Sequence, residues 1–290
     1  MASSIVSTQH IAPYARLAPS RLRQEFQGKA VLITGGGYGI GASIARSFAE
    51  AGVAAIILAG RTQSNLQSTA DELTRSFPGV KVSYRTVDVA SKVSVSNLFA
   101  SLTDSPDILI NNAGYLPQPE TFVTADLDEW WKGYEINVLG TAFVTQTYLR
   151  HRASQKAEAK EPGIVITLNT FAAYSARAPT LSSYVSSKTA AARVIELLAA
   201  EVPESVARFI SVNPGAVKTA MYHKSGFEGV VDIPATDSQL SAEFIVWSAS
   251  KEAEFLSGRF AWANWDVEEL IAKKEVILKN DLLISSLKEF

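Results

Sequence analysis

Two side chains in one predicted helix have the types and the spacing needed to move a proton. Tyr184 and Lys188 are four residues apart near the start of an expected helix over 183–202, so both project from one helix face. A free tyrosine is a weak acid, with a pKa of about 10, but a nearby ammonium favours the phenolate and lowers that pKa. We therefore expect Tyr184 to give or take a carbonyl or hydroxyl proton near neutral pH.

A glycine-rich segment earlier in the chain indicates what lies beside this pair. Residues 34–41 read Thr-Gly-Gly-Gly-Tyr-Gly-Ile-Gly, after an apolar run over 30–33 and before an apolar-periodic segment over 42–51. Strand, glycine turn and helix in that order present free N–H groups and the positive end of a helix dipole to a phosphate. A nucleotide-hydrolysing P-loop needs Lys and then Ser or Thr after its last glycine, whereas this chain has Ala42 there. The pattern therefore favours a dinucleotide.

The residue twenty positions beyond Gly41 indicates which dinucleotide this is. An acidic residue at that distance would bind the ribose 2′-hydroxyl of NAD(H), but the sequence has Arg61, after an apolar run over 54–59. A guanidinium pairs instead with a 2′-phosphate, so NADP(H) is favoured over NAD(H). The alternative is that Arg61 is simply solvated at the end of a strand.

The elements that must position these residues alternate along the chain. Near-continuous apolar runs are typical of strands in a parallel sheet that helices cover on both sides. We therefore predict a single-domain α/β fold, a doubly wound parallel sheet of the Rossmann type with helices on both faces. Residues 28–260 would form this domain, between an N-terminal arm over 1–27 and a C-terminal extension over 261–290. The predicted strands are 30–34, 54–59, 81–87, 107–111, 163–168 and 207–212, and the predicted helices are 40–52, 62–76, 91–103, 126–152 and 183–202.

Ligands bind at the carboxyl ends of the strands in such a sheet, and four predicted ends are polar or rich in glycine. The first is the glycine turn. The others are Asp88-Val89, the run Asn111-Asn112-Ala113-Gly114, and the run from Asn213 to Thr219. One such end would be an ordinary turn, whereas four at one edge of a sheet predict a shared ligand.

Composition excludes several classes of function. The 290 residues carry a formal net charge of −2, which gives no electrostatic support for binding nucleic acid or an anionic membrane. The chain has no cysteine and its three histidines lie far apart, so thiol catalysis is excluded and no metal site is expected. With no apolar run long enough to span a membrane and no secretory signal, a cytoplasmic location is expected.

Five motifs, taken in order, resemble those of the classical short-chain dehydrogenase/reductase family. The resemblance covers roughly residues 28–260, and the tail over 258–266 is similar to members from fungal secondary metabolism. The family's TGxxxGIG, NNAG, catalytic Asn, YxxxK and PG motifs correspond to Thr34–Gly41, Asn111–Gly114, Asn137, Tyr184–Lys188 and Pro214-Gly215.

The resemblance implies a role for each matched residue. Tyr184 would be the proton donor or acceptor, Lys188 would lower its pKa and bind the nicotinamide ribose, and Asn137 would help to hold a proton-relay water. The implied activity is that of an NADP(H)-dependent oxidoreductase acting on a small molecule, and family members often form homo-oligomers such as dimers or tetramers. The implied cofactor-binding residues are Thr34, Gly35, Gly37, Tyr38, Gly39, Ile40, Gly41, Arg61, Asp88, Val89, Asn112, Ala113, Gly114, Tyr184, Lys188, Pro214, Gly215, Val217 and Thr219.

One departure from the family pattern affects the chemistry. The family's catalytic serine usually lies thirteen residues before the tyrosine, where this chain has Phe171, and the neighbouring hydroxyl is that of Thr170. In one interpretation, Thr170 reaches the substrate oxygen in place of the serine. In the other, the hydroxyl is missing and Phe171 shapes an apolar pocket. Losing such a donor can slow a reaction by about 10²–10³, so the second interpretation favours a cyclase, an isomerase or a non-catalytic cofactor-binding protein.

The substrate side of the site is expected to be apolar. The segment after Thr219 lies where a substrate lid would lie, and we expect Phe171, Tyr174 and Met221 to contact the substrate. Together with the proton-transfer pair, this predicts interconversion of a carbonyl and a secondary alcohol on a small, fairly apolar molecule.

Overall fold

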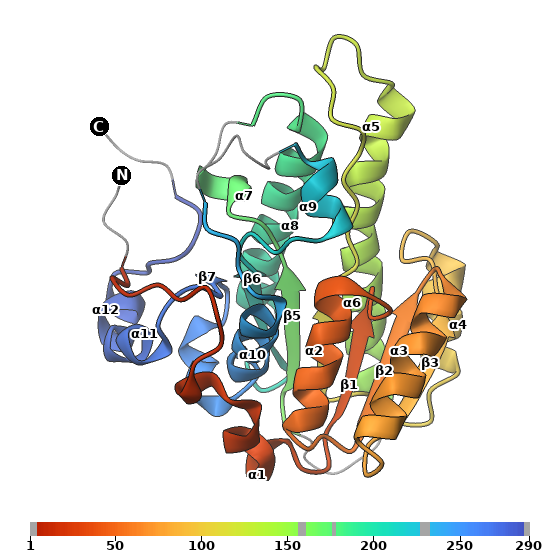
Figure 1. Ribbon diagram of the computed structural model, residues 1–290, viewed down its shortest axis with the longest axis vertical. Helices are drawn as coiled ribbons and strands as arrows, with labels where there is room; N and C mark the ends of the chain where they lie inside the picture. Colours follow the sequence, from red (N-terminus) through yellow and green to blue (C-terminus); the bar gives the residue numbers. More distant parts are fainter. Residues whose placement is uncertain (1–4, 156–160, 176–177, 227–232, 287–290) are drawn as a thin grey trace.

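Seven parallel strands form one sheet at the centre of the molecule (Figure 1). The computed structural model describes residues 5–155, 161–175, 178–226 and 233–286. The strand order is β3-β2-β1-β4-β5-β6-β7, so the direction in which strands are added reverses between β1 and β4, where such folds bind ligands. The strands are β1 (Ala30–Thr34), β2 (Ala55–Gly60), β3 (Lys81–Thr86), β4 (Ile108–Asn111), β5 (Gly163–Leu168), β6 (Ala207–Asn213) and β7 (Arg259–Trp262).

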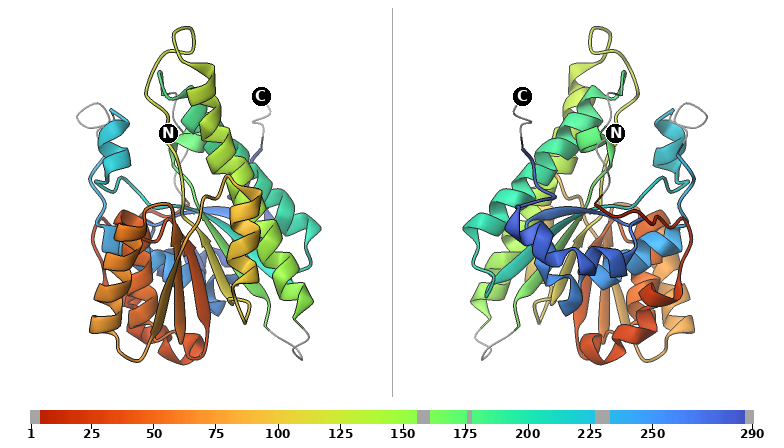
Figure 2. Two further views of the ribbon diagram at one scale, coloured as in Figure 1. Left: turned by 90° about the vertical axis from the view of Figure 1, so that its right-hand side faces the viewer. Right: turned by 90° about the vertical axis from the view of Figure 1, so that its left-hand side faces the viewer.

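Helices cover both faces of the sheet (Figure 2). Successive residues of a strand point to opposite faces, and accordingly Val31 and Ile33 belong to one hydrophobic core and Leu32 to the other. This arrangement confirms the predicted fold class. The first core is closed by α2 (Gly39–Glu50), α3 (Gln63–Ser76) and α10 (Ser238–Ser248), and the second by α4 (Lys92–Ala100), α6 (Thr141–Ser154) and α8 (Ser182–Glu201).

The two ends of the chain lie close together, and several short helices complete the fold. The segment before β1 lies beside the C-terminal helices (Figure 1), and an isolated bridge joins Gln9 to Trp265. The remaining elements are η1 (Ala15–Leu17), η2 (Pro19–Leu22), α1 (Arg23–Phe26), α5 (Leu127–Tyr134), η3 (Glu135–Gly140), α7 (Ala172–Ser175), α9 (Ala220–Lys224), η4 (Lys251–Leu256), α11 (Val267–Ala272) and α12 (Lys274–Lys279).

The six predicted strands are confirmed to within one residue at each end, whereas the helices were predicted less completely. The helix predicted over 126–152 is confirmed as continuous helical backbone from Leu127 to Ser154, but its middle is the π-helical turn η3, which joins α5 to α6. Such turns insert an extra residue and often occur at functional sites. The strand β7 and the helix α10 were not predicted at all. The boundaries at residues 27 and 260 stay predictions, and residues 1–4 and 287–290 lie outside the described ranges.

A buried carboxyl lies on α10, which packs against α2. Glu243 is 7% exposed, and its Oε1 accepts a hydrogen bond from Gln239 Nε2 at 3.2 Å. Its Oε2 has no partner among the described residues. Burial raises the pKa of Glu243, and the carboxylates of Glu50 and Asp237 add to the increase.

Replacing Glu243 by Gln should stabilise the fold at neutral pH. Because the pKa is higher in the folded state, the folded protein binds the proton more tightly, and its stability falls as the pH rises above the ordinary value of 4.5. Removing a buried, unpaired charge should raise the free energy of unfolding by about 1 kcal/mol or more at pH 7. Chemical denaturation across this pH range measures the gain, which should shrink toward pH 4.5. Glu201→Gln, at an exposed position on α8, is the control, and a gain independent of pH would contradict the assignment.

Candidate active site

Two adjoining cavities open at the carboxyl edge of the sheet. The larger, which we call the groove, has an empty volume of about 1220 Å³ that includes space open to solvent. The smaller, which we call the side cavity, has about 670 Å³. Tyr184, Asn169 and Met221 line both, so the two cavities meet at the tyrosine. Of the predicted cofactor-binding residues, the groove brings together Gly35, Gly37, Tyr38, Gly39, Ile40, Gly41, Arg61, Asp88, Val89, Asn112, Ala113, Gly114, Tyr184, Lys188, Pro214 and Thr219.

The glycine turn forms one wall of the groove, and its shape depends on glycine. A Cβ at Gly41 would lie 2.2 Å from the carbonyl oxygen of Gly35, and Gly35 itself has a φ of +65°. Asn112 Nδ2 donates to the carbonyl oxygens of Thr34 at 2.9 Å and Gly35 at 3.0 Å, which ties the turn to the end of β4. The side chain of Tyr38 makes no cap on α2, so the first N–H groups of that helix are left for a ligand.

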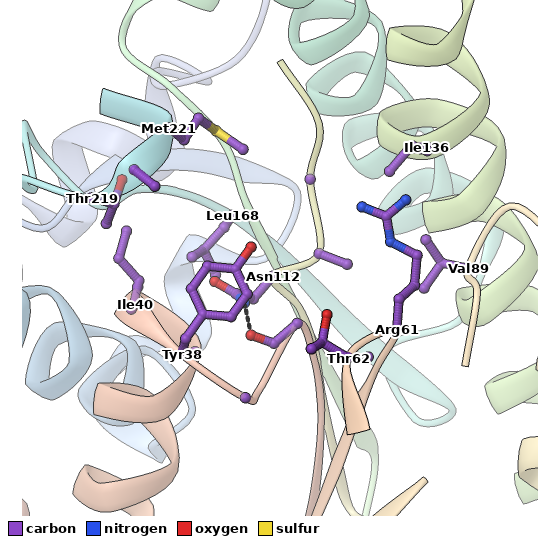
Figure 3. A pocket seen from close by; sticks show the side chains of 18 of the residues that line it. Tyr38, Ile40, Arg61, Thr62, Val89, Asn112, Ile136, Leu168, Thr219 and Met221 are labelled. Atoms are coloured by element: carbon purple, nitrogen blue, oxygen red, sulfur yellow. Dashed lines mark hydrogen bonds between the residues drawn. The ribbon is translucent and has the colours of Figure 1, made fainter. Parts of the chain in front are cut away.

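The opposite end of the groove carries a cation. Arg61 lies at the end of β2 and, among the residues that the structure describes, forms no ion pair or hydrogen bond. Figure 3 shows its side chain extending into the groove toward Val89 and Ile136. Thr62 also lines the groove and begins α3 without capping it through its side chain. An Arg guanidinium and a free hydroxyl at a helix start are suited to a phosphate.

Tyr184 and Lys188 both face the groove, near the start of α8. The Lys188 ammonium donates to the carbonyl oxygen of Leu168 at 2.8 Å, and Asn169 Nδ2 donates to the Lys188 carbonyl oxygen at 3.1 Å. Burial lowers the pKa of Lys188 to about 8. The end of β5 therefore holds the lysine from two sides.

The prediction that Lys188 lowers the pKa of Tyr184 is wrong for the protein alone. Burial raises the pKa of Tyr184 to about 12, and the group that acts in the opposite direction is the side chain of Thr170. Thr170 is itself buried and lines the side cavity with Phe171. The hydroxyl next to the tyrosine is thus that of Thr170, one residue before the expected serine position.

Asn137 lies inside the π-helical turn η3 and lines neither cavity. It is 1% exposed, and its Nδ2 donates to Tyr115 O and Ser187 Oγ, both at 2.9 Å. Its Oδ1 accepts from Tyr115 N at 2.8 Å. A Cβ at Gly114 would lie 3.4 Å from both Asn137 Oδ1 and Lys188 Nζ, so both side chains lie against this glycine. In this arrangement the side chain of Asn137 fixes the loop after β4.

The other predicted site residues either line the side cavity alone or line neither cavity. Gly215 and Val217 line the side cavity and not the groove. Thr34 lines neither, because its Oγ1 accepts from the N–H groups of Asn112 and Ala113, each at 3.1 Å. Tyr174 does not reach a cavity either: its hydroxyl contacts Glu196 and Ser285 and its ring packs edge-on against Phe260. Tyr174 is therefore not placed to contact the substrate.

The order of the motifs and the geometry of the groove agree with one family of enzymes. A family model described as short chain dehydrogenase matches residues 29–228. The chain belongs to this family, the short-chain dehydrogenases/reductases. It is thus an oxidoreductase of a family that binds NAD(P)(H).

Fungal proteins are similar over nearly the whole chain. The short chain dehydrogenase mpl6 of Monascus purpureus is 30% identical over 287 residues, which cover 96% of this chain and 94% of the relative. The short chain dehydrogenase/reductase AacuD of Aspergillus aculeatus is 32% identical, with coverage of 89% and 87%. The resemblance to fungal members of the family is thereby confirmed.

Solved structures share the fold. The oxidoreductase yciK from E. coli superposes with a TM-score of 0.73 at 21% identity and covers 83% of this chain and 97% of its own. The L-sorbose reductase from Gluconobacter frateurii, solved with NADPH and L-sorbose, has a TM-score of 0.72 at 26% identity, with coverage of 82% and 95%.

Sequence reasoning missed several residues of this dehydrogenase site. Thr62 and Asn169 follow the carboxyl ends of β2 and β5, so the rule that selected the other strand ends could have found them. Ile136, Leu168 and Tyr222 line the cavities without a comparable signal, because apolar residues are common throughout the core. Within the described ranges, no group of three or more His, Asp or Glu residues is placed to hold a metal, and no helix combines the length and apolarity needed to cross a membrane.

Proposed function

We propose that this dehydrogenase/reductase uses NADP(H) to interconvert a carbonyl and a secondary alcohol on a small, fairly apolar substrate. The observation that carries the proposal is the placement of the Thr170 and Tyr184 side chains together where the groove and the side cavity meet, with Thr170 acting to lower the pKa of the phenol. Two hydroxyls at this junction can bind one substrate oxygen, and one of them can exchange a proton with it.

The protonation state of Tyr184 favours reduction near neutral pH. With a pKa of about 12, the phenol keeps its proton, so it acts as the acid that donates to a carbonyl oxygen. When bound, NADPH supplies the hydride that adds to the carbonyl carbon. Lys188, with a pKa of about 8, is close to its titration point and would bind the ribose hydroxyls and favour the phenolate left behind.

The charge around Arg61 supports NADP(H) over NAD(H). Among the described residues that line the groove, Asp88 is the only carboxylate, and it follows β3 and not β2. The position where an acid would bind the ribose 2′-hydroxyl is occupied by Arg61, which forms no ion pair with any described residue, next to Thr62, whose side chain does not cap α3. The NADPH bound by the related L-sorbose reductase agrees with this choice.

The lining of the side cavity supports an apolar substrate. Leu116, Phe171, Met221 and Ile233 surround the space beside Thr170. Phe171 therefore shapes an apolar pocket while Thr170 supplies the hydroxyl, so the two interpretations of this pair do not exclude each other. The alternative of a cyclase, an isomerase or a non-catalytic protein rested on the missing serine, and the Thr170 hydroxyl weakens it. A cytoplasmic location and a homo-oligomer stay predictions.

Replacing Tyr184 by Phe should abolish turnover and leave cofactor binding intact. The variant loses the acidic hydroxyl but keeps the ring that lines the groove, so NADPH oxidation with a panel of apolar ketones should fall by about 10² or more. Loss of NADPH absorbance measures turnover, and protein fluorescence measures NADPH affinity. Tyr174→Phe, outside both cavities, is the matched control. Unchanged turnover in the Tyr184 variant would contradict the assignment, and tight binding without any oxidation by the wild type would favour the alternative.

Replacing Arg61 by Ser should reduce or remove the preference for NADPH over NADH. A charge-assisted hydrogen bond contributes about 1.5–3 kcal/mol, so the dissociation constant for NADPH should rise roughly 10- to 100-fold. Binding of NADH should stay within about twofold, because it has no 2′-phosphate. Arg75→Gln removes an exposed arginine from the last turn of α3, the helix that follows Arg61, and serves as the control. Equal loss of NADPH and NADH affinity would show that Arg61 has no selective role.

A further inference from the structure

Three segments that lie far apart in the sequence meet behind the turn Pro214–Val217. They are the N-terminal arm at residues 10–11, the residues 235–237 before α10, and Asn264 after β7. The turn itself lines the side cavity, and Pro214 also lines the groove. All three segments lie outside residues 29–228, which match the family model. Figure 1 shows the arm running along this side of the molecule toward the C-terminal helices.

Thr236 is seated directly against the turn. Its Oγ1 accepts from Ala216 N at 3.2 Å, and its backbone N–H donates to Ala216 O at 3.0 Å. A Cβ at Gly215 would lie only 2.3 Å from Thr236 Oγ1, so the glycine allows this close approach. Thr236 is 5% exposed and lines neither the groove nor the side cavity.

Asn264 links Thr236 to the N-terminal arm. Its Nδ2 donates to Thr236 Oγ1 at 3.0 Å and to the carbonyl oxygen of His10 at 2.8 Å. The backbone of His10 returns a bond to Asn264 O at 2.7 Å, and Asp237 N donates to Ile11 O at 2.8 Å. The arm is thus bonded to both segments that support the turn.

We propose that Thr236 and Asn264 are positioning residues that hold the turn Pro214–Val217 against the nicotinamide end of the cofactor. This inference rests on the proposed function. Neither side chain lines the groove or the side cavity, so both act through Ala216 and its neighbours. The turn lines the side cavity, which Arg61 does not line, so we expect its position to affect the nicotinamide half of the dinucleotide more than the adenosine half.

The test compares a whole cofactor with a fragment that lacks the nicotinamide. The Thr236→Val substitution keeps the shape of the side chain and removes the acceptor for Ala216 N and Asn264 Nδ2. A lost buried hydrogen bond of this kind should weaken NADPH binding about tenfold. The affinity for 2′-phospho-ADP-ribose, which lacks only the nicotinamide ring, should stay within about twofold. Isothermal titration of both ligands into the full-length protein measures the difference.

Two further variants separate positioning from general stability. Thr236→Ser restores the acceptor and should recover the NADPH affinity. Thr8→Val removes a hydroxyl that anchors the arm to Glu269 on α11, away from the turn, and should change neither affinity. If Thr236→Val does not fold in a thermal melt, Asn264→Ala, which leaves Thr236 in place, is expected to give the same selective loss.

The results distinguish a positioning role of Thr236 from a purely structural one. A selective loss of NADPH affinity with recovery by Ser supports the proposal. An equal loss for both ligands, or no loss, overturns it and leaves the NADP(H) assignment standing. If the wild-type protein binds neither ligand, the proposed function fails and the inference fails with it.

Discussion

Burial of a tyrosine and a lysine at the carboxyl edge of the sheet controls the chemistry that this site can perform. Desolvation disfavours charge on both groups, so the pKa of Tyr184 rises to about 12 and that of Lys188 falls to about 8. The side chain of Thr170 is the group that opposes this effect on the tyrosine. The end of β5 keeps these side chains in place: Asn169 binds the backbone of Lys188 and of Thr170, and the Lys188 ammonium donates to the carbonyl oxygen of Leu168.

The parts of the site that could be predicted from the sequence are those fixed by local rules. The glycine turn and its strand and helix follow from residues within one short segment, and their placement depends only on the topology of a parallel sheet. The same rule predicts that Arg61, Asp88 and Asn112 lie at one edge of the sheet, and all three line the groove. Applied to the end of β5, the same rule also selects Asn169, so the sequence does contain the information needed to predict this residue.

The parts that could not be predicted depend on burial and on contacts between distant segments. The helix α10 is buried along nearly its whole length, so it lacks the polar face that makes a helix periodic in sequence. The strand β7 is short and contains a buried Arg259, which no strand pattern would favour. The pKa of Tyr184 depends on desolvation, which spacing alone does not reveal. Asn264 bonds to His10 across 254 positions of sequence, and neither residue belongs to a motif.

The most direct test of the account is the rate of a single turnover in Thr170→Val compared with Thr170→Ser. Stopped-flow oxidation of bound NADPH by an apolar ketone isolates the chemical step from product release. We expect the Val variant to be slower by about 10²–10³, the Ser variant to stay within about tenfold of the wild type, and NADPH affinity to be unchanged in both. A Val variant as fast as the wild type would contradict the claim that this hydroxyl completes the site.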